Sequence, residues 1–258
     1  RKSNETIGFG YGMHSQVQPL YIYNTLFVDS TSNTYGTHND EIGPTQSHHL
    51  VLSYEKVVKK NLRIRGEVYY QQLYNVPVEM MNSSFSLLNQ GSGFERFFPG
   101  VLTNAGTGTN QGVEVTVEKF FTNNYYFMAT GSLYDSKYKG SDDVERNTDF
   151  NGNYIFNFLG GYEYRIGKND KNALIFGTKY TVGGGKRYSP IDTAATILDG
   201  ASVVLDGTRR NIFQFEDYSR LDVKIGIRIN TKKTTHEISI DIANVLDTKN
   251  VLKESYFD

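Results

Sequence analysis

The chain has 258 residues, and its 27 Lys and Arg against 28 Asp and Glu give a formal net charge of −1. Near-neutral charge gives no electrostatic case for a nucleic-acid partner. The absence of cysteine excludes a disulfide framework and any cysteine-based zinc site. No apolar run approaches the ~20 residues that a transmembrane helix needs. Aromatic residues make up 14% of the chain, which favours β-structure.

Period-two alternation of apolar and polar residues recurs along the chain and predicts roughly nine β-strands. The first strand lies around 7–11, where glycines at every second position (Gly8, Gly10, Gly12) leave one face without side chains. The clearest alternation comes late, with apolar residues at 223, 225, 227 and 229 and polar residues or glycine between them. The other strands are expected around 50–54, 62–68, 113–118, 125–133, 154–166, 173–182 and 238–243.

The connections between these strands alternate strictly in length. The short, polar ones lie at 59–61, 122–124, 167–172 and 231–234, and the long ones at 14–47, 76–109, 139–151 and 183–215. An antiparallel up-and-down sheet has this pattern when every short turn lies at one end. Outer-membrane β-barrels combine short periplasmic turns with long outer loops in this way. A compact soluble β-sandwich has no reason to sort its loops, and unstructured loops of this length are uncommon in it.

The two faces of the strands also fit a membrane wall, because charges such as Arg63 lie mid-strand opposite a continuous apolar face. A soluble antiparallel sheet with one solvated face produces the same alternation. The strand that opens with Tyr125 and Tyr126 closes near Tyr134 and Tyr138. Its tilted height of roughly 23 Å is close to the ~25 Å apolar band between two aromatic girdles. We therefore expect these tyrosines to mark the borders of a membrane.

Sequence motifs give no sign of catalysis or metal binding. His48 and His49 are adjacent, so on a strand they point to opposite faces and cannot hold one metal together. His236-Glu237 begins like a zincin motif, but no histidine follows four residues later. The acidic cluster at 142–145 lacks the spacing of a calcium loop. Neither a phosphate-binding loop nor a nucleophile elbow occurs, so we expect no enzyme, no cofactor and no metal site.

A series of short segments resembles parts of one protein family, in the expected order along nearly the whole chain. They are Tyr-Asn-Val-Pro-Val-Glu at 74–79, Asn-Gln-Gly-Val-Glu at 110–114, Tyr-Asp-Ser-Lys-Tyr-Lys-Gly at 134–140, followed by 146–148 and 150–154, Gly-Gly-Gly-Lys-Arg-Tyr at 183–188 with Pro-Ile-Asp at 190–192, Asp-Tyr-Ser-Arg-Leu-Asp at 217–222 and Asp-Ile-Ala-Asn-Val at 241–245. The ordered set resembles TonB-dependent outer-membrane receptors, in particular the subgroup with an N-terminal carboxypeptidase-regulatory-like domain.

This resemblance implies an all-β fold, an antiparallel up-and-down transmembrane β-barrel around an N-terminal plug. Such barrels have about 22 strands, so roughly nine strands cannot close one. Residues 1–258 are then expected to form a single partial barrel domain, with the plug domain and the final strand absent. Tyr256, Phe257 and Asp258 follow the last expected strand without a further alternating segment, which supports the expectation of a fragment from the C-terminal part of a receptor.

The resemblance also implies a function, namely TonB-energised uptake of a scarce large solute across the outer membrane of a Gram-negative bacterium. The solute classes are metal chelates, cobalamin and oligosaccharides, and the implied partners are outer-membrane lipids, the receptor's own plug, TonB and the ligand. Long outer loops capture the ligand in this family. The loop residues proposed to contact it are Phe94, Arg96, Phe97, Arg187 and Tyr188.

Three alternatives remain open from the sequence. An outer-membrane enzyme would need a nucleophile and a base brought together on the wall, and no motif supports it, although periodicity does not exclude scattered catalytic residues. A passive porin-like barrel would need an even number of strands and a final closing strand. A soluble, secreted β-sandwich that binds glycans would have loops of mixed length at both ends.

Overall fold

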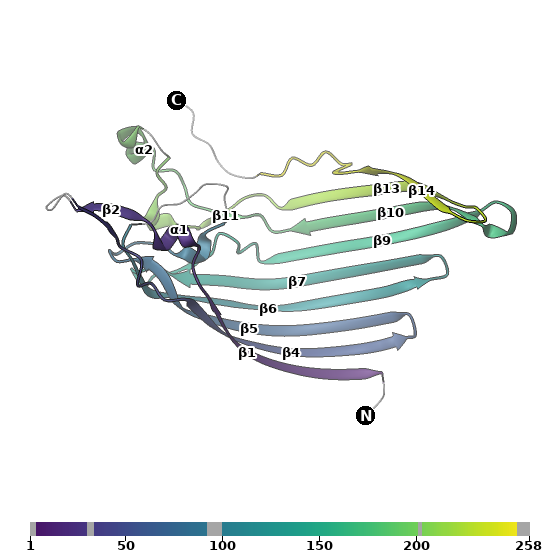
Figure 1. Ribbon diagram of the computed structural model, residues 1–258, viewed down its shortest axis with the longest axis horizontal. Coiled ribbons are helices and arrows are strands. Elements are labelled where there is room, and N and C mark those ends of the chain that lie inside the picture. Colours follow the sequence, from purple (N-terminus) through teal and green to yellow (C-terminus); the bar gives the residue numbers. More distant parts are fainter. Residues whose placement is uncertain (1–3, 30–33, 92–99, 201–202, 252–258) are drawn as a thin grey trace.

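The computed structural model describes residues 4–29, 34–91, 100–200 and 203–251. Its main feature is a ten-stranded antiparallel sheet in which nine long strands follow one another in chain order (Figure 1). These strands are β1 (Glu5–Gln16), β4 (Thr45–Lys59), β5 (Leu62–Glu79), β6 (Leu102–Thr122), β7 (Tyr125–Lys139), β9 (Tyr154–Ile166), β10 (Asn172–Gly183), β13 (Tyr218–Asn230) and β14 (Thr235–Ile242). The predicted nine strands and their up-and-down order are therefore confirmed.

Almost all short elements lie in the long connections, at the end of the sheet that we call the loop end (left in Figure 1). They are α1 (Leu20–Tyr23), β2 (Leu26–Asp29), β3 (Thr34–Thr37), η1 (Leu87–Asn89), β8 (Glu145–Asn147), β11 (Arg187–Tyr188), α2 (Thr193–Asp199), η3 (Gly207–Arg209) and β12 (Phe213–Gln214). Only η2 (Lys168–Asp170) lies in a short turn, at the opposite turn end. No helix in the described ranges has the length and apolar character needed to cross a membrane.

The short turns form because their residues suit tight hairpins. Asn123 and Asn124 join β6 to β7 with φ angles of 55° and 67°. A two-residue turn with positive φ at both positions matches the right-handed twist of the strands, and asparagine tolerates that conformation. Between β13 and β14, the amide of Thr231 donates to the carbonyl of Thr234 at 2.9 Å. Such turns fix the register of each hairpin and so the face on which each side chain lies.

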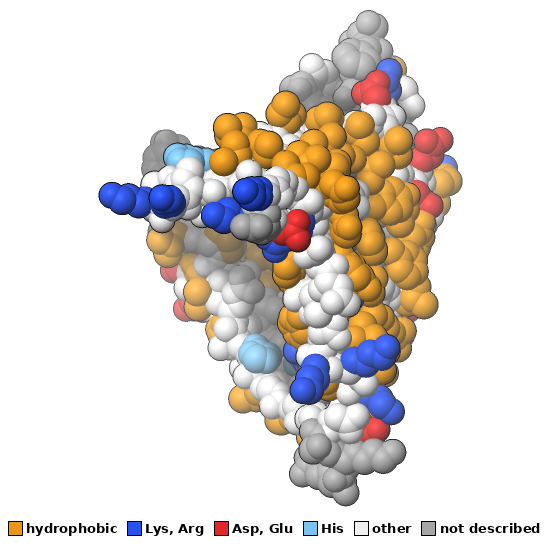
Figure 2. Space-filling view, turned by 90° about the vertical axis from the view of Figure 1, so that its right-hand side faces the viewer, with side chains coloured by type: hydrophobic (Ala, Val, Ile, Leu, Met, Phe, Trp, Pro, Cys, Tyr) orange, Lys and Arg blue, Asp and Glu red, His pale blue; other side chains and the backbone are white. Residues whose placement is uncertain are grey.

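One face of the sheet, the apolar face, is covered by aliphatic and aromatic side chains. In the strand register, Phe9 lies beside Leu52, Leu52 beside Val68, and Val68 beside Val113. These side chains are largely exposed, 75% for Phe9 and 55% for Leu52. Figure 2 shows apolar side chains gathered over one side of the sheet. Soluble monomers rarely expose an apolar surface that extends over so many strands, so this face needs a partner.

The buried core lies among the loops and not on the sheet. Ile22, Ile42 and Leu102 pack together at the loop end, with Tyr21 and Phe85 against them. The remaining sheets of the described chain, β2 with β3 and β11 with β12, have two strands each. A β-sandwich would place a second sheet on the apolar face. The described residues place none there, which argues against the sandwich alternative.

The hairpin of β5 and β6 is longer than the sequence predicts. The sequence predicts a loop over 76–109, but the strands continue to Glu79 and resume at Leu102. Two register shifts occur near Asn75, whose φ is 55°, and the bulge explains the lost alternation. Beyond it, Val76 and Val78 are fully buried, because this part of the hairpin packs against loops.

The predicted tyrosine borders are only partly correct. Tyr125 lies on the apolar face beside Tyr162. Tyr126 and Tyr134 have even numbers and therefore lie on the opposite face, because side chains alternate along β7. Tyr138 is 1% exposed and donates a hydrogen bond to the carbonyl of Ser84 at 2.8 Å, so it belongs to the loop core. The strand has the expected length, but three of the four tyrosines do not lie on the apolar face and so do not mark a membrane border.

Candidate ligand-facing wall

The face opposite the apolar one, the polar face, carries charged side chains that pair with each other across strands. Arg63 on β5 lies directly opposite Glu118 on β6, and their side chains are 2.6 Å apart. Arg228 on β13 pairs with Glu237 on β14 at 3.0 Å and with Glu163 on β9 at 2.6 Å. The pair with Glu163 reaches across β10, where the small side chain of Ala173 leaves room for it. Paired charges of this kind suit the wet or protein-filled interior of a barrel.

A pocket of about 480 Å³ opens on the polar face toward the loop end. Strands β4, β5, β6 and β7 supply its walls, and the loop after β8 supplies Phe150. Tyr69 on β5 and Tyr134 on β7 face each other across Gly112 on β6. The lining includes His49, Tyr69, Gln71, Asn110, Glu114 and Tyr134. Aromatic rings alternate here with amide and carboxylate groups, as in many sites for polar ligands.

The pocket is electronegative, because its lining holds Glu67, Glu114 and Asp135 but no lysine or arginine. Glu67 is neutralised by Arg65 at 2.8 Å, and Asp135 lies 3.6 Å from Lys137. Glu114 instead accepts a hydrogen bond from the hydroxyl of Ser132 at 3.3 Å. The pocket therefore favours neutral or cationic groups over anions.

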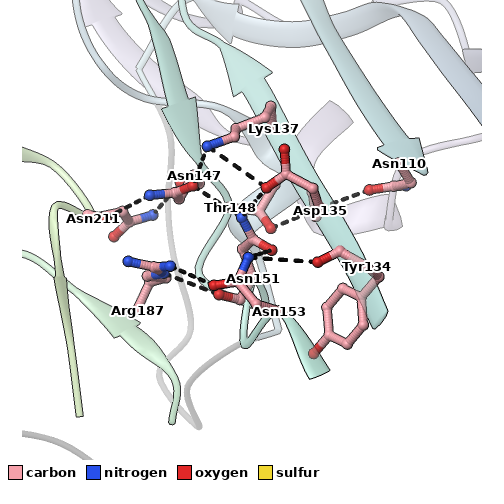
Figure 3. A network of polar contacts seen from close by, with 11 residues as sticks. Asn110, Tyr134, Asp135, Lys137, Asn147, Thr148, Asn151, Asn153, Arg187 and Asn211 are labelled. Carbon is pink, nitrogen blue, oxygen red and sulfur yellow. Dashed lines mark hydrogen bonds and ion pairs between the residues drawn. The ribbon is translucent and has the colours of Figure 1, made fainter. Parts of the chain in front are cut away.

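Beside this pocket, a network of amide side chains ties the outer loops to β7 (Figure 3). Asn151 donates to Asp135 at 2.8 Å, and Lys137 donates to Asn147 at 2.6 Å. The side-chain amide of Asn211, from the loop between β10 and β13, donates to the backbone carbonyl of Asn147 at 2.9 Å. The network thus fixes two long loops to one strand, so the rim of the pocket is held in place by many small contacts.

Glycines allow the same loops to cross at close range. A Cβ atom on Gly184 would lie 1.8 Å from the carbonyl oxygen of Gly152, and one on Gly185 would lie 2.0 Å from that of Phe215. Any larger residue would push the segments apart. This crossing borders a second pocket of about 340 Å³ that shares Tyr134 and Phe150 with the first.

The loop 140–153 is also held by an ion pair. Arg146 binds Asp142 through two hydrogen bonds of 2.9 and 2.7 Å. The side chain of Arg146 is 9% exposed and that of Asp142 is 20% exposed. Chiefly because of the hydrogen bonds from Arg146, the pKa of Asp142 lies below its usual value. Thr208 and Arg209 lower the pKa of Asp206 in the same way in the loop before β13.

The structure places two of the five proposed ligand-contact residues, and both take part in loop packing. Arg187 donates to the carbonyl of Asn151 at 2.9 Å and to the side chain of Asn153 at 2.6 Å. Tyr188 stacks on Phe215 with ring centroids 4.1 Å apart. Their contact with a ligand stays a prediction. Phe94, Arg96 and Phe97 lie outside the described residues.

The adjacent residues His48 and His49 point to opposite faces of the sheet, as the sequence predicts. His48 contacts Tyr11 and Tyr74 on the apolar face, whereas His49 contacts His14 and Tyr69 on the polar face. Within the described ranges, no group of three or more His, Asp or Glu side chains is arranged to hold a metal ion.

Sequence reasoning missed the pocket, because its residues come from four strands and one loop. Only the pairing register shows that Tyr69, Gly112 and Tyr134 form one row. The available signal was the position of each residue on the polar face of its strand, which alternation does give. Alternation does not give the register between neighbouring strands.

No protein-family model and no curated protein matches the sequence. Solved structures that share its fold include two outer-membrane proteins. The outer membrane transporter YddB from Escherichia coli matches with a TM-score of 0.61 and 11% identity, over 97% of this chain and 36% of YddB. The ferric-catecholate import receptor Fiu from E. coli K12, in its closed form, matches with a TM-score of 0.57 and 13% identity, over 97% of this chain and 30% of Fiu.

The chain thus spans about a third of the length of the two transport proteins it matches. At this level of identity the likeness shows the fold alone. The fold is that of a part of an outer-membrane transporter barrel, which confirms the fold class predicted from the sequence. Both neighbours are described as a transporter or a receptor and not as enzymes.

Proposed function

We propose that this chain forms part of the barrel wall of a TonB-dependent receptor in the outer membrane of a Gram-negative bacterium. The observation that carries the proposal is a sheet with two opposite faces, one apolar and left uncovered by the described residues, the other lined by paired charges. The described parts of the long loops lie at one end of that sheet. Lipid would cover the apolar face, and the receptor's plug would lie against the polar face.

In this proposal the receptor takes up a scarce large solute with energy from TonB. Three solute classes follow from the family resemblance, namely metal chelates, cobalamin and oligosaccharides. The pocket favours the last of these, because Tyr69 and Tyr134 offer flat rings for sugar faces. Gln71, Asn110 and Glu114 offer hydrogen-bonding groups for hydroxyls. No cation in the lining would attract an anionic solute.

A deletion of the gene tests the transport proposal directly. We expect the deletion strain to lose energised uptake of one large solute, and a TonB-deficient strain to lose the same uptake. The protein should fractionate with the outer membrane. Uptake that persists without TonB would favour the porin-like alternative, and a freely soluble protein would overturn the proposal.

A pair of tyrosine variants tests the pocket. Tyr69→Ala removes a ring from the pocket, whereas Tyr126→Ala removes a ring from the same polar face near the turn end, outside the pocket. We expect Tyr69→Ala to weaken oligosaccharide binding by about tenfold or more, since buried aromatic contacts dominate many binding sites. Tyr126→Ala should leave it within about twofold. Both affinities are measured by titration calorimetry on the whole receptor. If the two variants bind the oligosaccharide equally well, the pocket is not part of the binding site.

A further inference from the structure

The short turns of the sheet carry an unusual charge. Three of the four turns contain two lysines each, and the single acidic residue among them is Asp170. The fourth turn, Asn123-Asn124, is neutral. We call this set of lysines the turn rim, and it consists of Lys59, Lys60, Lys168, Lys171, Lys232 and Lys233.

The lysines of the turn rim are exposed and uncompensated. All six side chains are exposed. Among the described residues none of the six takes part in an ion pair, whereas the lysines that do lie elsewhere on the sheet or in the outer loops. On the polar face, by contrast, Arg63 and Arg228 each have a carboxylate within 2.6 Å. The wall neutralises most of its own cations, but the turn rim does not.

Local hydrogen bonds order the two turns that hold four of these lysines. In the turn 231–234, the hydroxyl of Thr231 accepts from the amides of Lys233 at 3.3 Å and Thr234 at 3.0 Å. Asn230 bonds to the carbonyl of Lys171, which joins this turn to the neighbouring one. Lys168, Lys171, Lys232 and Lys233 therefore form one group on two linked turns.

The turn rim adjoins the apolar face directly. Tyr125, Tyr162 and Tyr164 are exposed on that face near the same end. Figure 2, which looks onto the turn end, shows Lys and Arg side chains beside the apolar surface. Aromatic rings followed by lysines are typical of the level at which lipid chains give way to headgroups. A lysine there can lay its methylene stem along apolar surface and extend its amine to a phosphate.

We infer that the turn rim binds the phosphate groups of anionic phospholipids in the membrane leaflet at the turn end. This inference rests on the proposed function, because it requires the apolar face to lie in lipid. The lysines are distributed along the sheet edge over three turns, as a membrane border requires. The turns themselves offer no apolar side chain around which a protein partner could pack. Juxtamembrane lysines are attracted to anionic lipid headgroups, and the attraction is screened by salt.

The test compares lipid preference in the whole receptor, purified in detergent and placed in nanodiscs of phosphatidylglycerol and phosphatidylcholine. The number of phosphatidylglycerol molecules retained is measured by native mass spectrometry. The test variant carries Lys168→Gln, Lys171→Gln, Lys232→Gln and Lys233→Gln. We expect its preference for phosphatidylglycerol to fall by about tenfold or more at low salt.

Two controls make the result specific. The same four positions changed to arginine should keep the preference, because the charge remains. The combination Lys139→Gln, Lys179→Gln and Lys224→Gln removes lysines from strands β7, β10 and β13, away from the turn end, and this variant should also keep the lipid preference. An unchanged preference in the four-glutamine variant would overturn the inference. Displacement of the lipid by inorganic phosphate at matched concentration would also overturn it, because the site would then bind free phosphate.

Failure of the inference and failure of the proposed function are distinguishable. If every variant still fractionates with the outer membrane but none shows a lipid preference, only the turn rim loses its role. If the unmodified protein does not fractionate with membranes, the barrel proposal itself fails. Retention of an acidic periplasmic protein in place of phosphatidylglycerol would assign the rim to a protein partner and overturn the lipid assignment.

Discussion

The two faces of this sheet are made by the same strands, yet they are specified in different ways. On the apolar face, Phe9, Leu52 and Val68 lie in one row without any directional contact between them. On the polar face, Arg63 needs Glu118 opposite it, and Arg228 needs Glu163 two strands away. The first face requires only a type of residue, whereas the second requires particular partners at particular offsets.

This difference follows from the surroundings that each face is proposed to have. Lipid chains offer no hydrogen bonds, so any polar group on the apolar face would lose its water without replacement. The polar face meets water or protein, where a charge is tolerated but is most stable beside its opposite. Tolerance to substitution should therefore differ sharply between consecutive residues of one strand.

The largest effect is expected from an arginine on the apolar face. Leu52→Arg and Ser53→Arg change consecutive residues of β4 that lie on opposite faces, Ser53 beside Glu67. Leu52→Arg should destabilise the inserted barrel by about 2–4 kcal/mol, as a charge facing lipid does. Ser53→Arg should change the stability of the barrel by less than about 1 kcal/mol, because Glu67 and Glu114 lie close to the new arginine. Denaturant titration of the receptor in lipid vesicles measures both.

A reversed order of these two variants would mean that the faces are assigned the wrong way round. Equal and small effects would mean that neither face meets lipid. The pair therefore tests the orientation of the wall without depending on the ligand.

A smaller effect is expected from Arg228→Gln, which removes the cation shared by Glu163 and Glu237 and leaves Glu237 with Lys224 at 3.6 Å. The side chain of Glu163 is 13% exposed, and Arg165 at 3.3 Å compensates it only in part. We expect a loss of about 1–2 kcal/mol, because a partly buried charge loses its partner. The double variant Arg228→Gln with Glu163→Gln should recover part of this loss. Additive losses in the same denaturant titration would show that the two residues do not interact.

The sequence predicts the features that require only a type of residue, and it does not predict those that require particular partners from different strands. Alternation around Val223–Ile229 and the sorted connections predict the strands, their order and their faces, because each strand must present one kind of side chain to each side. Alternation says nothing of the bulge at Asn75, since the hairpin beyond it packs against loops. Alternation also does not predict the pocket, because Tyr69 and Tyr134 are brought together only by the register of β5, β6 and β7.

The smallest expected effect concerns the pair of Asp142 and Arg146, which lies in an outer loop and not on the wall. Folding lowers the pKa of Asp142 below its ordinary 3.8, chiefly through the hydrogen bonds from Arg146. The stabilisation is therefore fully present above about pH 3.8 and is lost as the pH falls through the lower, folded value. Asp142→Asn should remove about 0.5–1 kcal/mol from the local stability of the loop at pH 7.

Hydrogen exchange of the amides in 140–147 measures this loss. Protection at pH 7 should fall by about two- to fivefold in Asp142→Asn, and the difference from the unmodified protein should vanish as the pH falls below the folded pKa. Protection of residues 125–133 of β7 should not change, because this part of the strand pairs with β6 and β9, whereas residues 137–139 pair with β8 in the loop. A loss of protection that extends into 125–133 would mean that the outer loops and the wall unfold as one cooperative unit.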